Sequence, residues 1–333
     1  MTEANLTQRP TLKTIAYLAK LGVSTVSRAL KDGPEISAET RARVKLIAQQ
    51  IGYLPNRAGV RLKTGRTNVI SLVLNPQDGE SGFFSNIVYG ISDALAETGY
   101  HLVVTPYSLS DPMVPIRYIV ETNSADGVII SRTQPDDARV RYMLDHGMPF
   151  VTHGRTDMGI EHCYFDYDNE AFAADAVRML KDRGRKSVAL YGPPPSLTYF
   201  RHTQLGLEHG LMNNGLTGFV VGSVDTDSGT AELRNSAYEL SQRDQRPDGF
   251  ICSSSSVTLA VVAGMADGGL EIGADYDVVA KPINELIHLA QPRIIGVDED
   301  FRESGRNLAS MLLSHIQGTA PTELQRVARS PTF

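Results

Sequence analysis

The sequence predicts two kinds of structure in one chain: an N-terminal all-α helix-turn-helix headpiece and an α/β core of two lobes, each built on a doubly wound parallel sheet. Apolar residues recur at helical spacing over the first 51 residues. From residue 69 onward, short apolar runs of strand length alternate with helical stretches. At 333 residues the chain has room for a small module and two lobes.

Charge is divided unevenly along the chain. Residues 1–66 carry twelve lysines and arginines against four acidic residues, a net charge of +8, whereas the whole chain has −6 and residues 67–333 therefore carry −14. Clustered cations displace the counterions condensed on phosphates. A basic module on an acidic body favours contact with nucleic acid through the basic end.

Two short amphipathic segments lie back to back between Thr11 and Leu30. The apolar positions at helical spacing are Ile15, Ala16 and Ala19 in the first segment and Val26, Ala29 and Leu30 in the second. Gly22 separates them, and glycine is tolerated at a helix N-cap and accepts unusual backbone angles. This layout is typical of a helix-turn-helix, whose second helix enters the DNA major groove, although an ordinary amphipathic helix pair remains the alternative.

A third helix is expected from residue 37 to residue 51. Val44, Ile47, Ala48 and Ile51 recur at i, i+3, i+4 and i+7. Ser37 and Thr40 can cap the start of this helix, and Gly52 ends it. Its outer face carries Arg41, Arg43 and Lys45.

Three helices followed by a Pro-Asn-Arg segment and a leucine closely resemble the headpiece and hinge of the LacI family of transcriptional regulators. The matching residues are Leu12, Ile15, Ala16, the run TVSR at 25–28, Gly52-Tyr53, Pro55-Asn56-Arg57 and Leu62. The resemblance covers essentially the whole chain. It implies that Leu62 is an apolar wedge that enters the minor groove beside its symmetry mate and bends the duplex.

The residues expected to contact DNA lie on the second helix and in the hinge. Small or hydroxylated side chains can approach base edges and phosphates, and a methyl group can pack against thymine. The candidates are Thr14, Val23, Ser24, Thr25, Ser27, Arg28, Asn56, Arg57 and Leu62. Because Pro55 suits a helix start and Gly59 weakens so short a helix, we expect the hinge to fold on its operator.

The core is expected to contain parallel strands that alternate with helices. Apolar runs place strands at about 69–74, 101–105, 127–130, 149–152, 187–191, 219–221, 249–252, 277–280 and 293–297. The first core helix is expected at about 84–98. Because this series of strands and helices is too long for one sheet, we expect two lobes, with a crevice between them at the carboxyl ends of their strands. The family resemblance implies the same core, which is like that of type I periplasmic binding proteins.

These patterns divide the chain into a headpiece (residues 1–54), a hinge and linker (55–66) and an effector-binding core (67–333). In the core, the first lobe is expected to contain about 67–165 and 298–322, and the second lobe about 166–297 and 323–333. The chain should cross between the lobes near 164–168, near 297–301 and once more close to the C-terminus.

The candidate effector-binding residues are grouped after the ends of expected strands. They are Phe83, Phe84, Tyr107, Ser131, Arg132, His153, Arg155, Asp166, Tyr199, Arg201, His202, Ser254, Ser255 and Lys281. Aromatic faces with arginines and carboxylates suit a sugar, because its C–H faces stack while its hydroxyls donate and accept hydrogen bonds. The resemblance implies that an aromatic residue in the GFFS motif at 82–85 stacks on the ligand.

The chain departs from the family at three places that usually contact the sugar through arginine, asparagine and aspartate. Thr203, Ser254 and Pro282 align there. Arg201 and Lys281 are close enough in sequence to replace some of the lost polar groups. Serine in place of asparagine leaves more room, which favours a disaccharide or glycoside over a free hexose.

Other patterns point away from catalysis and from the membrane. The sequence contains no GxxxxGK[ST] loop, no GxSxG elbow and no HExxH motif, so we expect no enzymatic activity, no metal and no cofactor. Cys163 and Cys252 are far apart in sequence and are expected to be buried thiols in a reducing cytoplasm. No apolar run approaches the length of a membrane span, and the N-terminus lacks the apolar core of a signal peptide.

We therefore expect a sequence-specific transcriptional regulator, most often a repressor in this family, of genes for carbohydrate uptake or catabolism. A small sugar between the lobes would release it from operator DNA. A homodimer is expected because one helix-turn-helix reads a half-site, and residues 323–333 lack the heptad repeat that joins dimers into tetramers. A sugar-binding receptor without a DNA-binding role and a regulator with a sugar corepressor are the alternatives.

Overall fold

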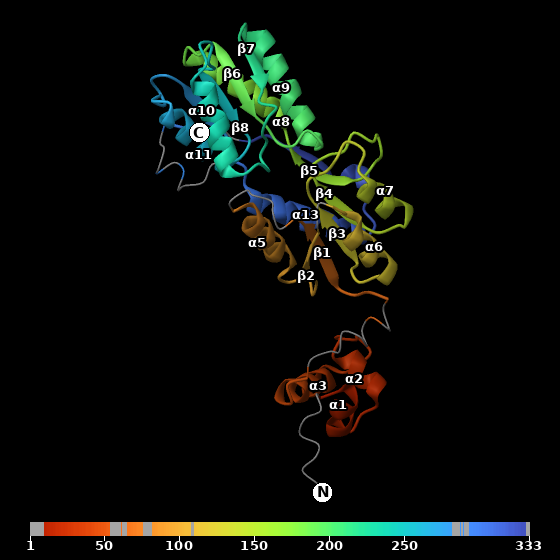
Figure 1. Ribbon diagram of the computed structural model, residues 1–333. Helices are drawn as coiled ribbons and strands as arrows, with labels where there is room; N and C mark the ends of the chain where they lie inside the picture. The colour runs from red at the N-terminus through yellow and green to blue at the C-terminus, as the bar shows by residue number, and fades with distance from the viewer. Residues whose placement is uncertain are drawn as a thin grey trace. The chain divides into compact units, whose positions relative to one another are not determined.

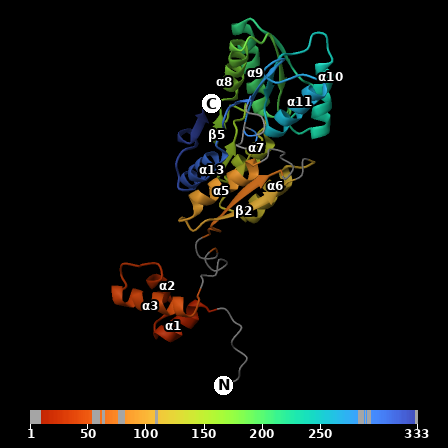
Figure 2. The ribbon, with the colours of Figure 1, turned by 90° about the vertical axis from the view of Figure 1, so that its left-hand side faces the viewer.

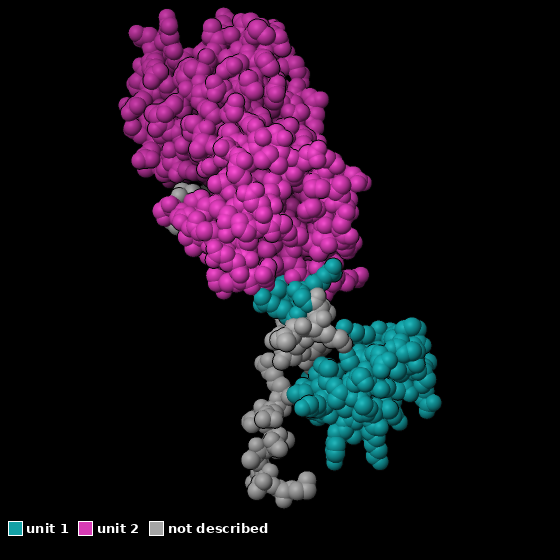
Figure 3. All heavy atoms as spheres, turned by 90° about the vertical axis from the view of Figure 1, so that its right-hand side faces the viewer, with its two compact units in different colours: residues 1–67 teal, residues 68–333 magenta. Residues whose placement is uncertain are grey.

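The structure is a computed structural model that describes residues 10–53, 61, 65–75, 82–107, 110–281, 287, 289 and 293–330. The chain divides into two units, residues 1–67 and 68–333, which Figure 3 shows in different colours. The first unit contains the headpiece helices, and the second unit, the core domain, contains the strands. Among the described residues, no helix combines the length and apolarity that crossing a membrane requires.

The headpiece consists of three helices around a small apolar centre. They are α1 (Leu12–Ala19), α2 (Val23–Ala29) and α3 (Ala38–Gln50). The fully or nearly fully buried side chains are Ile15, Ala16, Ala19, Val26, Ala29, Val44 and Ala48. The predicted apolar positions therefore form the core of this unit.

The caps of the headpiece helices agree in part with the sequence prediction. Ser37 accepts a hydrogen bond from the backbone N–H of Thr40 at the start of α3, and Gly52 follows the helix with φ of 64°. Gly22 caps α2 as expected, but its φ of −68° is ordinary extended backbone. The left-handed residue of this turn is Lys20, with φ of 52°, so the conformational freedom of Gly22 is not used.

The cations of α3 hold the headpiece together. Arg43 donates from Nη2 to the carbonyl oxygen of Ala19 (3.0 Å), at the C-terminal end of α1 where carbonyl groups lack helical partners. Lys45 forms an ion pair with Asp32 at 2.6 Å. These two cations therefore have structural partners within the headpiece.

All the strands of the core domain pair in parallel. The first sheet has the order β11-β5-β4-β3-β1-β2 and the second has the order β10-β9-β8-β6-β7. The strands of the first sheet are β1 (Val69–Leu74), β2 (His101–Pro106), β3 (Gly127–Ile130), β4 (Phe150–His153), β5 (Cys163–Tyr167) and β11 (Gln325–Ala328). Those of the second are β6 (Ser187–Tyr191), β7 (Thr217–Val220), β8 (Gly249–Cys252), β9 (Asp277–Ala280) and β10 (Ile295–Gly296).

Helices cover both faces of each sheet (Figures 1 and 2). The first lobe contains the first sheet and helices α5 (Phe83–Leu95), α6 (Met113–Thr122), α7 (Ala138–Asp145) and α13 (Phe301–Ile316), followed by a 3₁₀ turn at Pro321–Glu323. The second lobe contains the second sheet and helices α8 (Asn169–Asp182), α9 (Thr198–Asn214), α10 (Thr230–Ser241) and α11 (Ser255–Asp267). Helices α5 and α13 share one buried cluster with the first sheet, and α8 and α9 share one with the second. The predicted α/β fold of two doubly wound parallel sheets is confirmed.

Glycines let two helix pairs pack at very short distance. A Cβ atom on Gly90 of α5 would lie 1.9 Å from the carbonyl oxygen of Arg302 in α13. A Cβ atom on Gly206 of α9 would lie 2.1 Å from the carbonyl oxygen of Glu170 in α8. Arg302 and Glu170 lie in the first turns of α13 and α8, and each glycine packs against the first turn of its partner helix. The close packing therefore fixes where the N-termini of α13 and α8 lie.

Two strands were not predicted, and one changes the assignment of the C-terminus. β5 contains an aspartate among aromatic residues, and β11 is a largely exposed edge strand, so neither forms an apolar run. The sequence assigned 323–333 to the second lobe, but Gln325–Ala328 pairs with Cys163–Tyr167 in the first sheet. The third crossing therefore begins after β11, where Arg329 forms an ion pair with Asp175 of α8 at 2.9 Å.

Candidate ligand pocket and nucleic-acid interface

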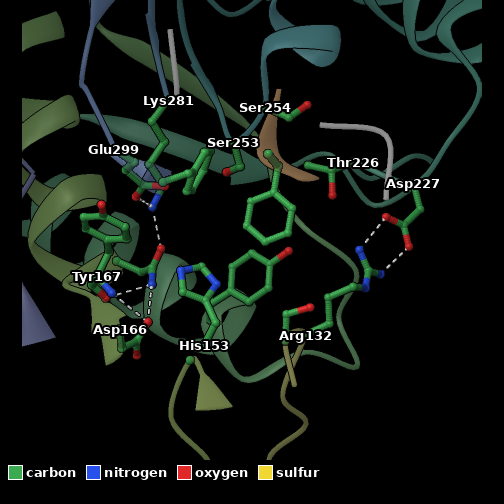
Figure 4. Close-up of a pocket in the computed structure, with 16 residues that line it drawn as sticks. Arg132, His153, Asp166, Tyr167, Thr226, Asp227, Ser253, Ser254, Lys281 and Glu299 are labelled. Carbon is green, nitrogen blue, oxygen red and sulfur yellow. Dashed lines mark hydrogen bonds and ion pairs between the residues drawn. The ribbon is translucent and has the colours of Figure 1, made fainter. Parts of the chain in front are cut away.

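A pocket lies between the two lobes of the core domain (Figure 4). It encloses about 820 Å³, including the space open to solvent. Side chains at or just beyond the carboxyl ends of strands from both sheets line it, which is where open α/β sheets bind their ligands. Those lining residues include Ser131 after β3, His153 at the end of β4, Ser253 after β8 and Lys281 after β9.

Aromatic rings line much of the first lobe's side of the pocket. Phe83 begins α5 and Phe301 begins α13, and their rings meet edge to face with centroids 4.9 Å apart. The imidazole of His153 lies 5.6 Å from the ring of Phe83, and Tyr167 also lines the pocket. The second lobe adds Tyr199 from the start of α9. These faces can stack on the apolar C–H surface of a ligand.

Three buried polar atoms in the pocket lack a hydrogen-bond partner among the described residues. They are Oγ of Ser131, Oγ of Ser253 and Nε2 of His153. Burial lowers the pKa of His153 below its ordinary value, although the charges of Asp166 and Glu299 oppose this shift. The imidazole is therefore neutral near pH 7, and an unpaired buried polar atom of this kind costs free energy until a partner arrives.

A buried ion pair lies at one end of the pocket. Nζ of Lys281 lies 2.7 Å from Oε1 of Glu299 and also donates to Oδ1 of Asn169. The ammonium group lies 4.6 Å from the centroid of the Phe172 ring. The side chains of Lys281 and Glu299 are 5% and 8% exposed, so this pair is shielded from solvent. Figure 4 shows it on the side of the pocket opposite Arg132.

A second ion pair crosses from one lobe to the other. The guanidinium group of Arg132, after β3, donates to both carboxylate oxygens of Asp227, with Nη1 3.0 Å from Oδ1. Both residues line the pocket. Arg132 has φ of 54°, a left-handed conformation that is uncommon for residues other than glycine and that often marks functional sites.

Other contacts join the lobes beside this pair. The backbone N–H of Thr198 donates to the carbonyl oxygen of Thr133 (2.9 Å). Arg201 of α9 pairs with Asp157 in the segment after β4. These contacts hold the two lobes against each other across the pocket.

The second headpiece helix exposes a compact set of side chains. Val23, Ser24 and Arg28 are exposed on α2, while Thr25 and Ser27 are half-buried. Nε of Arg28 lies 3.4 Å from the carbonyl oxygen of Ser24 on its own helix. This surface has the size and polarity of a helix that reads a major groove.

Comparison with known proteins identifies the families of the headpiece and of part of the core domain. Residues 11–56 match the family described as bacterial regulatory proteins, lacI family, and residues 177–333 match a periplasmic binding protein-like domain. The HTH-type transcriptional regulator AglR of Rhizobium meliloti is 31% identical over 328 residues, covering 94% of this chain and 90% of AglR. The chain belongs to the lacI family.

Solved structures extend this result. A complex of the transcriptional regulator CelR with cellobiose is 25% identical, with a TM-score of 0.68 and coverage of 98% of both chains. The lac repressor dimer bound to operator and the anti-inducer ONPF is 19% identical, with a TM-score of 0.83 and coverage of 98% of both chains, which shows a shared fold. As a lacI-family member, the chain is a DNA-binding transcriptional regulator and not an enzyme.

Eight of the fourteen predicted effector residues line the pocket of this lacI-family core. They are Phe83, Ser131, Arg132, His153, Asp166, Tyr199, Ser254 and Lys281. The hydroxyl of Ser254 also accepts a hydrogen bond from the backbone N–H of Val257 and so caps α11. The prediction that polar and aromatic residues after the strands converge is confirmed for these eight; their contact with a ligand stays a prediction.

The other six do not line the pocket. Phe84 is 46% exposed on α5, and the adjacent Phe83 takes the pocket position because helix residues one apart point in different directions. Tyr107 is buried in the first lobe and lies under the guanidinium of Arg139. Ser255 is buried within the first turn of α11.

Arg155, Arg201 and His202 form a charged cluster beside the pocket rather than in its lining. Nε of Arg155 lies 2.8 Å from Oδ2 of Asp166 and thereby holds that pocket carboxylate in place. Arg201 pairs with Asp157, so it does not replace a lost sugar contact. Thr203 likewise points into its own helix, donating to the carbonyl oxygen of Tyr199 (2.7 Å), and Pro282 lies outside the described residues.

Eight further residues line the pocket. Gly154, Asn169 and Ser253 lie in the same segments after strands, and at the same crossing, as the predicted candidates. The five that were not predicted as effector contacts are Tyr167, Thr226, Asp227, Glu299 and Phe301. Tyr167, Glu299 and Phe301 lie at the expected crossings between the lobes, and this position was the available signal. Thr226 and Asp227 lie in the segment between β7 and α10, several residues beyond the end of the strand, and nothing local in the sequence marks them.

In the headpiece, the structure describes Thr14 and the five α2 candidates, whereas Asn56, Arg57 and Leu62 lie outside the described residues. The hydroxyl of Thr14 accepts from the backbone N–H of Thr11 (3.1 Å), so this side chain takes part in the capping of α1. Tyr17 was not predicted, yet its side chain is 84% exposed on α1.

Proposed function

We propose that this regulator binds a small sugar or glycoside in the interlobe pocket and that the sugar, in place of any cofactor, controls its affinity for operator DNA. The observation that carries the proposal is that aromatic rings and the unpaired buried polar atoms of Ser131, His153 and Ser253 line the same pocket. A sugar offers the apolar C–H face and the hydroxyl groups that such a lining lacks. A relative of similar fold, CelR, has been solved with cellobiose.

Small side chains at two of the positions that usually contact the sugar in the family favour a disaccharide. The serine at position 254 and the threonine at position 203 leave space where longer side chains occupy the pocket in the family. The regulated genes would then serve carbohydrate uptake or catabolism.

The coupling to DNA would follow from the position of the pocket between the lobes. A ligand that bridges both lobes stabilises one arrangement of them over another, and its effect is limited to the difference in affinity for the two arrangements. Because the first lobe follows the hinge directly in the chain, a change in lobe angle would change the spacing of two hinges in a dimer. We propose that the sugar releases a repressor in this way; stronger DNA binding with sugar would instead indicate a corepressor.

A homodimer in the cytoplasm is part of the proposal. A single helix-turn-helix reads a half-site, so a two-fold pair matches a pseudo-palindromic operator. The first lobe exposes large apolar side chains on α5, on the edge strand β2 and on α6: Tyr89, Val103, Val104, Val114 and Tyr118. Sedimentation of the purified chain should give twice the mass of 36.3 kDa.

A mobility-shift titration on the DNA upstream of its own gene tests this function. The probes are glucose, maltose, trehalose and cellobiose, each added to a preformed complex. Release of the DNA by one of them supports a sugar-induced repressor. A DNA complex that no probe alters, together with no thermal shift of the protein by any probe, would contradict sugar control.

A further inference from the structure

The charges in the pocket lining are matched in pairs. Among the lining residues that the structure describes, the cations are Arg132 and Lys281, and the carboxylates are Asp166, Asp227 and Glu299. Arg132 gives both of its terminal nitrogens to Asp227. Lys281 donates to Glu299 and to Asn169. Each cation of the pocket therefore faces a carboxylate of the same pocket.

Neighbouring cations do not alter this balance. Arg155 pairs with Asp166, and Arg201 pairs with Asp157. The core segments outside the description, at 76–81, 108–109, 282–286, 288, 290–292 and 331–333, contain no lysine or arginine in their sequence. The core domain of the chain thus brings no further side-chain cation from those segments.

Of the five helix N-termini that contribute residues to the pocket, those of α8 and α13 carry a capping carboxylate, and those of α5 and α9 have no side-chain cap. An N-terminus attracts anions through its free N–H groups and its dipole. α8 and α13 each begin at an aspartate, Asp168 and Asp300, whose carboxylate accepts from a backbone N–H of the first turn. α11 begins at Ser254, whose hydroxyl is a neutral cap. The groups left with unpaired hydrogen-bonding capacity, on Ser131, His153 and Ser253, are uncharged near pH 7.

From this arrangement we propose that Asp227 and Glu299 are specificity determinants, which neutralise Arg132 and Lys281 and thereby restrict the pocket to uncharged sugars, excluding phosphorylated and acidic ones. The inference rests on the proposed function, because it names the class of sugar for that site. A phosphate that approached Arg132 would meet the carboxylate of Asp227 at contact distance from the same guanidinium. The carboxylate cancels most of the attraction that its cation would exert on the phosphate, and the remainder does not offset the cost of desolvating the phosphate in a partly buried site.

The test compares each neutral sugar with its own 6-phosphate. Isothermal titration of the full chain uses glucose, maltose, trehalose and cellobiose and the four corresponding 6-phosphates. The wild-type protein should bind its neutral sugar at least about tenfold more tightly than the phosphate of that sugar. Equal or tighter binding of the phosphate would overturn the inference and would leave sugar binding intact. No binding by any of the eight probes would overturn the proposed function together with the inference.

Variants assign the discrimination to its residue. Asp227→Asn keeps the shape of a side chain that is 31% exposed and removes the carboxylate that faces Arg132, so the ratio of the affinities for the neutral sugar and its phosphate should narrow about tenfold. Asp157→Asn is the matched control, because it removes an equally exposed carboxylate that pairs with an arginine outside the lining. In Asp157→Asn the ratio of the affinities for the neutral sugar and its 6-phosphate should match that of the wild type.

A double variant tests whether Arg132 is responsible for the increased affinity for the sugar phosphate. Arg132→Gln combined with Asp227→Asn should return the ratio toward the wild-type value, because the guanidinium that would attract the phosphate is then absent. An unchanged ratio in Asp227→Asn, or the same change in Asp157→Asn, would overturn the role of Asp227. Thermal unfolding of each variant shows that the compared proteins are folded.

Discussion

The headpiece and the interlobe pocket are assembled in opposite ways along the chain. The headpiece has its three helices within residues 11–53, and its apolar stripe and the exposed side chains of α2 that we expect to face DNA belong to the same short helices. The pocket draws on the ends of strands and helices from residue 83 to residue 301, and its two ion pairs join residues 95 and 18 positions apart.

The charges of the two regions differ in the same way. Residues 1–66 carry an excess of cations, which suits a polyanion that is recognised through many phosphates. The pocket balances each lining cation with a carboxylate, which suits a neutral ligand that is recognised through shape and hydroxyl groups. The comparison teaches that the headpiece and the pocket are suited to ligands of different charge. If both ligands bind, any coupling between them must pass through the lobes and the hinge.

Lys281→Met is the strongest test of this separation. It leaves the carboxylate of Glu299 buried without its cation, and breaking such a pair typically costs about 3–5 kcal/mol. The core domain should unfold at a clearly lower temperature and sugar binding should be lost. Below that temperature, the salt dependence of DNA binding should be unchanged, because no headpiece residue is altered.

A double variant separates charge from packing at this place. Lys281→Met combined with Glu299→Leu removes both charges and should recover most of the free energy of unfolding. It should not recover sugar binding, because both side chains line the pocket. If single and double variants were equally unstable in calorimetry, the cost would come from packing and not from the unpaired charge.

Ser24→Ala addresses the other side of the comparison. Ser24 is exposed on α2, and the loss of a real base contact should change the preference at one or two operator positions by about 1–3 kcal/mol. Sugar affinity should not change. Selection of operator variants from a randomised pool, followed by sequencing, measures the preference.

The matched variant for Ser24→Ala is Arg57→Ala. We expect Arg57 to contact phosphate, so its loss should weaken binding to all operators alike and reduce the salt slope by about 0.9. A specific change in base preference from Arg57→Ala, with none from Ser24→Ala, would reverse the two assigned roles.

Mild acid should affect the core and spare the headpiece. All eight histidines lie in the core domain, and burial lowers the pKa values of His153, His162 and His202 below their ordinary range. The unfolded chain, with histidine pKa values near 6.5, therefore binds more protons than the folded core below that pH. The core should lose stability from about pH 6.5 downward and be insensitive to these groups above it.

His153→Phe isolates the pocket's part of this effect. The aromatic packing against Phe83 and Phe301 is retained while the titrating group is removed. The fall in melting temperature between about pH 7.5 and pH 5.5 should become smaller, by an amount equivalent to about 1.4 kcal/mol per unit of the pKa difference. His101→Gln, at an exposed position on β2, is the control and should retain the wild-type fall.

The sequence predicted the two regions to different depths for a physical reason. The headpiece follows from local periodicity and caps, since Ile15, Val26 and Val44 bury because of their spacing alone. The parallel sheets follow from apolar runs, yet β5 and β11 were missed because one contains Asp166 and the other is an exposed edge. These two strands form because β11 pairs with β5, and because Arg155 pairs with the carboxylate of Asp166. Neither partner is visible in the local sequence pattern.

The pocket was predicted where its residues directly follow a buried strand, as for Ser131 and Lys281. It was not predicted where a long-range partner decides the direction of a side chain. Arg201 was expected to reach a ligand, but Asp157 of the other lobe binds it. Asp227 was not expected, because its partner Arg132 lies 95 residues away and in a different lobe. Such choices depend on the packed arrangement of the lobes, which spacing along one chain does not contain.

The central claim is that the sugar and the operator contact different parts of the chain, while the binding of each changes the free energy of binding of the other. Coupling of this kind is reciprocal, so a sugar that weakens operator binding must itself bind less tightly to the operator complex by the same factor. Isothermal titration with the most effective of the four neutral sugars, in the presence and absence of saturating operator DNA, measures that factor directly. We predict a loss of sugar affinity of about 5–150-fold on the operator complex, equal to the loss of operator affinity with sugar. Equal sugar affinity in the two states would contradict the account.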